Sequence, residues 1–266
     1  MRPRTHWDVV AYRTLNAALI AFLLAPIVVV LLFSINPAPF IQFPPQGVSL
    51  RWYEKFFASR DFMAAFRLSA LLALLTVVGA TVIGTLAAIA LVRGRVPGAG
   101  FLAALFLSPL MLPAILTGLA LFQFYVLLDV GRPFWGLLVG HVVIAIPYVI
   151  RTTVAVLTNF DRSLEEAARN LGASELATFR EVTLPLIRPG VIAGAIFAFV
   201  ISFDQFPLSL FLVNPGHETL PITMFNYLRY DFDPTIAAAS TVSIILSIAV
   251  VLLLERTVGL QEYVKL

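Results

Sequence analysis

Residues 161–188, DRSLEEAARNLGASELATFREVTLPLIR, form a densely charged stretch in a chain that is otherwise strongly apolar. They hold nine of the chain's 33 charged residues (18 basic and 15 acidic), whereas 60% of the whole sequence is hydrophobic. Within the stretch, one apolar face follows the i, i+3, i+4, i+7 spacing of an α-helix and comprises Leu164, Ala167, Ala168 and Leu171. The stretch therefore predicts a short amphipathic helix set between apolar segments.

The ends of this helix are marked by residues that favour helix caps. Ser163 and Glu166 fit a capping box, in which each side chain bonds the backbone of the other. Gly172 suits the left-handed residue that commonly ends a helix. Ser174 then predicts the cap of a second short helix, which we expect to end before Pro185. The sequence thus predicts two short helices joined at a glycine corner.

Two interpretations of this predicted pair of helices follow from its periodicity. In the first, the pair is a solvated connector whose alanines pack on the protein's own apolar segments. In the second, its apolar face is a docking element that inserts into a groove of a partner protein.

The composition places the rest of the chain in the membrane-protein class. Only 12% of the residues are charged, against roughly 25% in soluble domains. The net charge of +3 is scattered between apolar runs instead of forming one basic face, so we expect no nucleic-acid partner. The sequence has no cysteine, and its three histidines lie in separate regions, so no disulfide and no metal site is predicted.

Six apolar runs are long enough, or nearly so, to cross a bilayer as helices, which takes about 20 residues. They cover residues 15–35, 68–92, 101–128, 135–157, 189–213 and 235–254. The first run exceeds the apolar core of a signal peptide and no cleavage motif follows it, so we expect it to be retained. We predict an all-α membrane protein with one transmembrane domain over residues 1–266. Gly79 and Gly84 are expected to be close-packing points between helices, and the 36–66 loop is expected to hold a short surface helix.

Lysine and arginine are distributed unequally between the two sides of these predicted spans. Twelve basic residues fall on the side that holds both termini and the 158–188 loop, and six fall on the opposite side. Because basic residues are enriched in cytoplasmic loops, both termini and the charged loop are predicted to lie in the cytoplasm.

The charged loop also carries a motif with fixed spacing. It reads EAA, three residues, G, nine residues, V, one residue, LP, and is formed by Glu166, Ala167, Ala168, Gly172, Val182, Leu184 and Pro185. This pattern resembles the EAA loop of permease subunits in bacterial binding-protein-dependent ABC importers, and departs from it only by Val182 in place of isoleucine. The resemblance implies an inner-membrane protein with the six-helix, MetI-like permease fold. It also implies that the 158–188 loop couples the permease to an ATPase. The implied coupling residues are those of the motif apart from Val182: Glu166, Ala167, Ala168, Gly172, Leu184 and Pro185.

The resemblance further implies the partners of such an importer. These are a dimer of cytoplasmic ABC ATPases, a second homologous permease and a periplasmic solute-binding protein, assembled in the lipid bilayer. The chain itself has no GxxxxGK[ST] phosphate loop, so ATP is expected to bind to the partner and no cofactor to this chain. Common motifs of hydrolases and dinucleotide enzymes are also missing, which predicts a transport subunit and not an enzyme.

Three further segments resemble the spermidine/putrescine branch of these permeases. They are Gly140-His141 followed by Ile146 to Arg151, Ser202-Phe203-Asp204, and Thr219-Leu220-Pro221. The resemblance implies a polyamine or a similar small organic cation as the substrate. Gln205 departs from this branch, in which an acidic residue often follows the aspartate.

Two polar residues inside the predicted spans each have alternative roles. Asp204 is either a carboxylate of the substrate pathway, with Phe203 and Gln205 beside it, or a structural acid hydrogen-bonded within the bundle, because an unpaired acid in the bilayer is costly. His141 is either a core histidine hydrogen-bonded across helices or part of the pathway. If Asp204 and His141 both carried transported protons, the chain would instead be an ion-coupled secondary transporter.

Overall fold

The structure, a computed structural model, describes residues 6–40, 42–94, 96–214 and 216–258, and these are predominantly helical. Contacts between Cα atoms divide them into two compact units. One unit comprises the described residues within Met1–Met63 and Met224–Leu246, and the other comprises those within Ala64–Thr223 and Ser247–Leu266. All the candidate site residues belong to the second unit.

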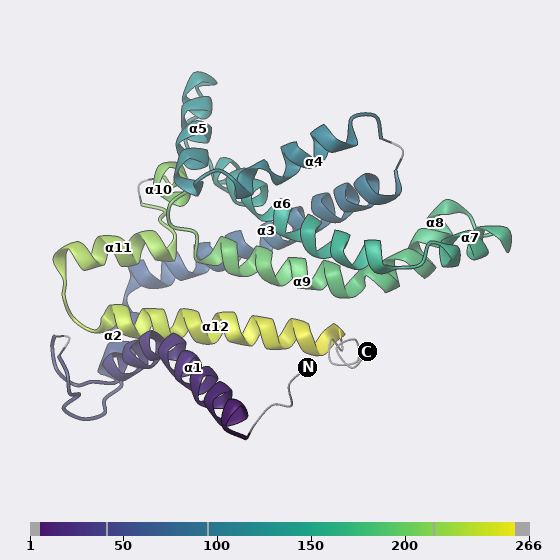
Figure 1. Cartoon of the computed structure of the whole chain (residues 1–266). Coiled ribbons are helices and arrows are strands. Elements are labelled where there is room, and N and C mark those ends of the chain that lie inside the picture. Colours follow the sequence, from purple (N-terminus) through teal and green to yellow (C-terminus); the bar gives the residue numbers. More distant parts are fainter. Residues whose placement is uncertain (1–5, 41, 95, 215, 259–266) are drawn as a thin grey trace. The chain divides into compact units, whose positions relative to one another are not determined.

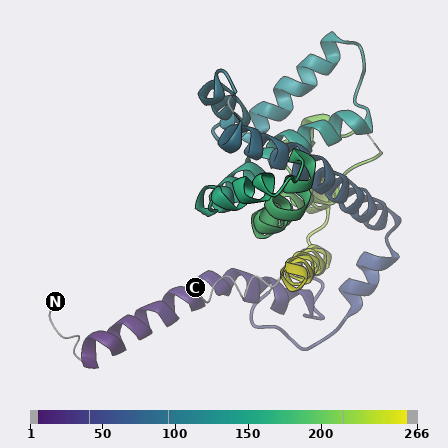
Figure 2. The ribbon, with the colours of Figure 1, turned by 90° about the vertical axis from the view of Figure 1, so that its right-hand side faces the viewer.

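Five helical segments of the described chain are long and apolar enough to cross a membrane. They are α1 (His6–Ser34), α3 (Arg60–Arg93), α6 (Phe134–Asn159), the continuous segment Glu175–Phe203, and α12 (Thr235–Val258). Each overlaps one of the predicted runs, which confirms the all-α membrane class. Figure 2 shows α1 as one continuous helix, although it contains Pro26. Shorter helices include α2 (Arg51–Ala58), α7 (Ser163–Asn170), α10 (Ser209–Leu212) and α11 (Leu220–Tyr230).

The third predicted span is broken instead of continuous. It consists of α4 (Ala99–Leu107) with a 3₁₀ turn, η1 (Ser108–Leu110), and then α5 (Ala114–Leu127), and the chain bends by 104° between the two halves. Pro113 explains the break, because proline has no N–H to donate and pushes the preceding residue out of the helical region. The run predicted as one span over 101–128 therefore consists of two helices at an angle, and the bent pair is a sixth span only if both halves cross together.

The fifth span differs from its predicted limits of 189–213 at both ends. It begins with α8 (Glu175–Thr178), continues through a π-helical turn, η2 (Phe179–Thr183), and ends with α9 (Leu184–Phe203). The expectation that a second short helix ends before Pro185 is also wrong. The second part of the charged stretch, from Glu175 onward, and the fifth span instead form one continuous helical rod, which is visible in Figure 1.

The π-helical turn explains why Pro185 does not end this rod. At the end of η2 the Leu184 N–H donates to Phe179 O, five residues earlier, so the regular ladder of hydrogen bonds to the fourth residue back is already displaced. Pro185 then falls in the first turn of α9, where a missing N–H is tolerated.

The helices α6 and α9 pack closely and run side by side in Figure 1. Glycines allow this approach. A Cβ atom added to Gly190 would lie 2.6 Å from Thr152 O, and one added to Gly194 would lie 2.7 Å from the Cα of Val149. The two glycines have the GxxxG spacing that is typical of helices that associate in membranes.

The predicted packing points on α3 are confirmed. A Cβ atom on Gly79 would lie 3.0 Å from Val142, and one on Gly84 would lie 2.7 Å from Val149, both on α6. Small buried side chains fill the apolar core that α3, α6 and α9 share, including Ala80, Ala88, Ala145 and Ala198. These three helices therefore form the closely packed frame of the second unit.

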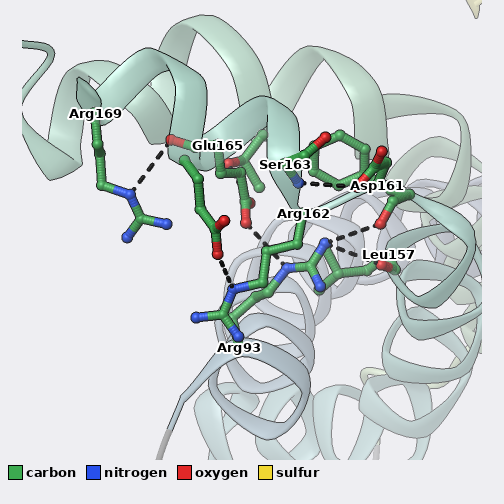
Figure 3. A network of polar contacts seen from close by, with 10 residues as sticks. Arg93, Leu157, Asp161, Arg162, Ser163, Glu165 and Arg169 are labelled. Carbon is green, nitrogen blue, oxygen red and sulfur yellow. Dashed lines mark hydrogen bonds and ion pairs between the residues drawn. The ribbon is translucent and has the colours of Figure 1, made fainter. Parts of the chain in front are cut away.

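A largely buried ion pair fastens α7 to the ends of this frame, as Figure 3 shows. Arg93 Nε, at the end of α3, lies 3.1 Å from Glu165 Oε2 on α7. Glu165 Oε1 accepts a 2.7 Å hydrogen bond from the hydroxyl of Thr183 in η2. Arg93 also donates hydrogen bonds of 3.3 Å to two backbone oxygens at the end of α6, those of Leu157 and Phe160. One arginine thus connects α3 with α6 and α7.

In the first unit, α2 is the surface helix predicted for the loop after α1. The side-chain oxygen of Asn36 accepts hydrogen bonds from two backbone N–H groups of this loop, and Trp52 Nε1 of α2 donates to the backbone oxygen of Asn36 at 2.7 Å. Lys55 of α2 forms an ion pair with Asp233, which precedes α12. By forming hydrogen bonds with backbone N–H groups, Asn36 therefore orders a loop that has no regular secondary structure of its own.

We predict that Glu165→Gln lowers the free energy of unfolding by about 3 kcal/mol, because it leaves the mostly buried guanidinium of Arg93 without its counter-charge. The matched control is Glu166→Gln, one residue later. Its carboxylate pairs with Arg162 at 3.5 Å on the surface, so its loss should cost less than about 0.5 kcal/mol. Denaturant unfolding of the purified chain in detergent measures both, and equal losses for the two variants would show that the buried pair has no special role.

Candidate functional site

The glycine corner predicted at the end of α7 is present. Gly172 has a φ of +92°, in the left-handed region that favours glycine. Its N–H donates to Arg169 O at 2.9 Å, and the N–H of Ala173 donates to Ala168 O at 3.1 Å. These are the two hydrogen bonds of a Schellman motif, which closes the end of a helix and turns the chain.

The first cap of α7 differs from the predicted capping box. Ser163 is the first helical residue, and its N–H donates to Asp161 Oδ1 at 2.9 Å. The Asp161 carboxylate takes the role predicted for the Ser163 hydroxyl, because a charged acceptor near a helix N-terminus is the stronger one. This hydrogen bond holds the pKa of Asp161 below its ordinary value. At the second helix, Ser174 accepts from the Ala177 N–H at 3.2 Å and caps α8 as predicted.

The apolar face of the α7–α8 hairpin (Ser163–Thr178) points outward. Leu164 is 48% exposed, Leu171 89% and Leu176 74%. Ala167 is exposed too, whereas Glu165 retains only 6% exposure. Within this chain the three leucines and Ala167 therefore do not pack on its own helices, whereas Ala168 is half-buried. A clustered apolar surface left open in this way is typical of an interaction site.

The other predicted coupling residues lie on or beside this surface. Glu166 is exposed, and Ala168 is half-buried on the flank of α7. Gly172 forms the exposed corner, and Leu184 and Pro185 are exposed at the start of α9. The structure thus brings the motif together on one continuous piece of helix and corner, while its docking role stays a prediction.

Arg93 and Glu165 are candidate functional residues, and the periodicity of the sequence does not reveal them. Glu165 lies beside the apolar face of α7 and resembles a solvated residue in sequence. Arg93 resembles the basic residue that commonly follows a membrane span. The available signal is slight: Arg93 comes directly after the uncharged 68–92 run, but nothing in the sequence names its partner.

His141 is fully buried on α6, and both its ring nitrogens are within hydrogen-bonding distance of serine hydroxyl groups, one on α9 and one on α10. Nδ1 lies 2.8 Å from Ser202 Oγ, and Nε2 lies 3.0 Å from Ser209 Oγ. The Ser209 hydroxyl also donates a hydrogen bond to Gln205 O at 2.6 Å. A hydrogen bond of 3.2 Å continues the network from Ser202 to Thr76 on α3. These contacts agree with a core histidine hydrogen-bonded across helices.

The apolar run predicted that Asp204 lies inside a continuous span. In the structure, Asp204 lies instead at a break between two helices. The helix α9 ends at Phe203, Asp204 follows it with an exposed side chain, and α10 begins at Ser209. Phe203 is buried and stacks on Phe199, with ring centroids 5.7 Å apart, while Gln205 is half-buried. His141 holds both sides of this break, through a serine before it and a serine after it. The role of Asp204 towards a substrate stays a prediction.

Comparison with known proteins identifies the family. Residues 80–259 match the family described as "Binding-protein-dependent transport system inner membrane component". The spermidine/putrescine transport system permease protein PotC of Escherichia coli (strain K12) is 32% identical over 236 residues, which cover 88% of this chain and 89% of that protein. The putrescine transport system permease protein PotI of the same strain is 34% identical over 227 residues, covering 83% of this chain and 80% of that protein.

Solved structures share the fold. A bacterial ABC transporter involved in the import of the acidic polysaccharide alginate aligns with a TM-score of 0.70 at 18% identity, over 96% of this chain and 99% of that one. The MetNI methionine ABC transporter aligns with a TM-score of 0.62 at 20% identity, over 76% and 98%. None of these matches supports an ion-coupled secondary transporter. The chain belongs to the family of binding-protein-dependent transport system inner membrane components, and is a multi-pass permease subunit of an ABC importer with the MetI-like fold.

Proposed function

We propose that this chain forms part of the translocation pathway of an ATP-driven importer for spermidine, putrescine or a similar small organic cation. The observation that carries the proposal is the 32–34% identity to two polyamine permeases over more than four fifths of this chain. The chain contributes no cofactor site of its own, and ATP binds to the partner subunits.

The partners of the importer follow from the family. The proposed assembly holds this chain, a second homologous permease, two cytoplasmic ABC ATPase subunits and a periplasmic solute-binding protein. One structurally similar transporter has been solved in complex with a "pentasaccharide-bound periplasmic protein", which supports a partner of this last kind. The proposed orientation places both termini and the α7–α8 hairpin in the cytoplasm, in accordance with the distribution of basic residues.

The outward face of the α7–α8 hairpin is the proposed contact with the ATPase. Its exposed leucines provide the apolar anchors that a helix needs to bind in a groove. Behind this face, Glu165 is bonded to α3 through Arg93 and to η2 through Thr183. Movement of the ATPase would therefore be transmitted to α3, and through the continuous rod to α9.

Asp204 is the proposed contact for a cationic substrate. Its carboxylate is exposed at the end of α9, where the helix breaks and where an acid facing lipid would be unfavourable. Phe203 and Gln205 flank it, and the His141 network holds the break in place from both sides. In this arrangement His141 positions the pathway and does not carry a transported proton.

The whole proposal is tested by uptake into proteoliposomes that hold this chain with the ATPase, second permease and binding protein of its own source. We expect ATP-dependent accumulation of radiolabelled putrescine or spermidine, with each competing against the other, because their charged amines share one carboxylate. Uptake of an unrelated solute that polyamines do not inhibit would contradict the substrate class. Accumulation by this chain alone, driven by an ion gradient, would contradict the importer.

The docking surface predicts the outcome of Leu171→Asp. A charge placed in the centre of an apolar contact should reduce ATPase co-purification by at least about tenfold, since an unpaired charge is costly to bury. Val48→Asp is the control, because Val48 is also a highly exposed apolar residue but lies in the loop before α2. Both variants should keep the wild-type melting temperature in detergent. Retention of the ATPase by Leu171→Asp would remove Leu171 from the interface.

The proposed pathway carboxylate predicts the outcome of Asp204→Asn. The substitution keeps the shape of the side chain but loses its charge, so polyamine uptake should fall by about tenfold or more while ATPase co-purification is unchanged. Asp129→Asn is the matched control, because Asp129 is exposed and its φ of +54° is one that asparagine tolerates well. Normal uptake by Asp204→Asn would assign Asp204 a structural role.

A further inference from the structure

A cavity lined by both charged and apolar side chains lies on the inner side of the α7–α8 hairpin, opposite its exposed leucines. Its volume is about 150 Å³, and three arginines line it from two elements: Arg93 at the end of α3, and Arg162 and Arg169 on either end of α7. Since a water molecule takes up about 30 Å³ of the liquid, the cavity has room for about five atoms of that size. A tetrahedral oxyanion such as phosphate has five heavy atoms and fits this volume.

The charges of the lining residues are incompletely balanced. Glu165 is neutralised by Arg93, 3.1 Å away, and by the hydroxyl of Thr183. Arg162 pairs only loosely, at 3.5 Å, with a Glu166 carboxylate that is largely exposed to water. Arg169 donates its Nε to a backbone oxygen at 3.3 Å, and among the described residues no carboxylate forms an ion pair with it. The cavity therefore holds one arginine without a counter-charge and another with a weak one.

The terminal nitrogens of the two weakly paired arginines are the donors that a ligand would meet. An oxyanion in the cavity would accept charge-assisted hydrogen bonds from Arg162 and Arg169, which are stronger than hydrogen bonds between neutral groups.

We infer that this cavity binds a phosphate-class oxyanion at the base of the α7–α8 hairpin, held by Arg162 and Arg169. Glu175 opposes this binding, because its carboxylate also lines the cavity. Glu175 is exposed, however, so that water screens its charge. The ligand would lie between α7 and α8, since residues of both helices line the cavity.

The source of the oxyanion is either a lipid headgroup or a free phosphate group. The cavity adjoins the ends of α3 and α6, so the proposed orientation places it near the cytoplasmic headgroups of the bilayer. Basic pockets at this level commonly bind anionic lipids. The inference rests on the proposed function only in placing the cavity on the cytoplasmic side of the membrane. Binding to the purified chain is measured without any transport.

The first experiment measures binding of inorganic phosphate to the full chain, purified in a nonionic detergent, by isothermal titration calorimetry at constant ionic strength in chloride. We expect one saturable site, weakened at least about tenfold by Arg169→Gln, since a charge-assisted hydrogen bond contributes more than one factor of ten. Glu175→Gln should tighten it, because it removes the carboxylate that opposes the ligand. The control is Arg180→Gln, an exposed arginine of η2 outside the cavity, which should leave the affinity unchanged.

A second arm identifies the source. Chain reconstituted in nanodiscs of phosphatidylcholine with phosphatidylglycerol is released into native mass spectrometry, and the phosphatidylglycerol that stays bound is counted. Retention that Arg169→Gln reduces and Arg180→Gln does not assigns the site to a lipid headgroup. Saturable phosphate binding without such retention assigns it to a free phosphate. The inference is overturned if Arg169→Gln behaves like Arg180→Gln in both arms.

Discussion

The ion pair between Arg93 and Glu165 determines which way α7 faces. A carboxylate withdrawn from water needs a counter-charge and a hydrogen-bond donor, which Arg93 and Thr183 provide. With about 100° between successive helical residues, turning Glu165 inward places Ala167 and Leu171 on the opposite side of the helix. The exposed apolar face is thus a geometric consequence of one buried acid, and a polar contact sets the direction of an apolar surface.

The helical rod from Glu175 to Phe203 connects the two candidate regions of the molecule. At one end it carries the second helix of the hairpin, and at the other it ends beside Asp204. Glycines at the α6 contact let the rod pack directly against the backbone of its neighbour, which leaves little space for bending. A displacement of the hairpin would therefore reach the break at Asp204 as a movement of the whole rod.

The sequence predicts those features of this chain that depend on local pattern. The class of the protein, the positions of most spans, the Gly172 corner and the Ser174 cap follow from composition, spacing and backbone preference. The start of the fifth span does not, because proline usually ends a helix and the π-helical turn that accommodates Pro185 leaves no simple trace. The capping of α7 by Asp161 is likewise a competition between two nearby acceptors, and the stronger one prevails.

Long-range polar contacts are the part of the candidate site that sequence alone does not give. His141 meets serines that lie on both sides of a helix break, and Glu165 meets an arginine from the far end of another span. Such partners are chosen by tertiary packing, so no periodicity or motif links them. The broken third span shows the same limit in another form, since Pro113 explains a break in the helix but does not predict its bend of 104°.

The π-helical turn also changes the phase of the rod. Leu176 and Ile187 are eleven residues apart, close to three full turns of an uninterrupted α-helix, which would align them on a single stripe. Yet Leu176 is open to its surroundings and Ile187 is completely enclosed. The wider turn between them offsets the stripe, so that a single helix exposes one hydrophobic side near the hairpin and buries a different one in its own bundle.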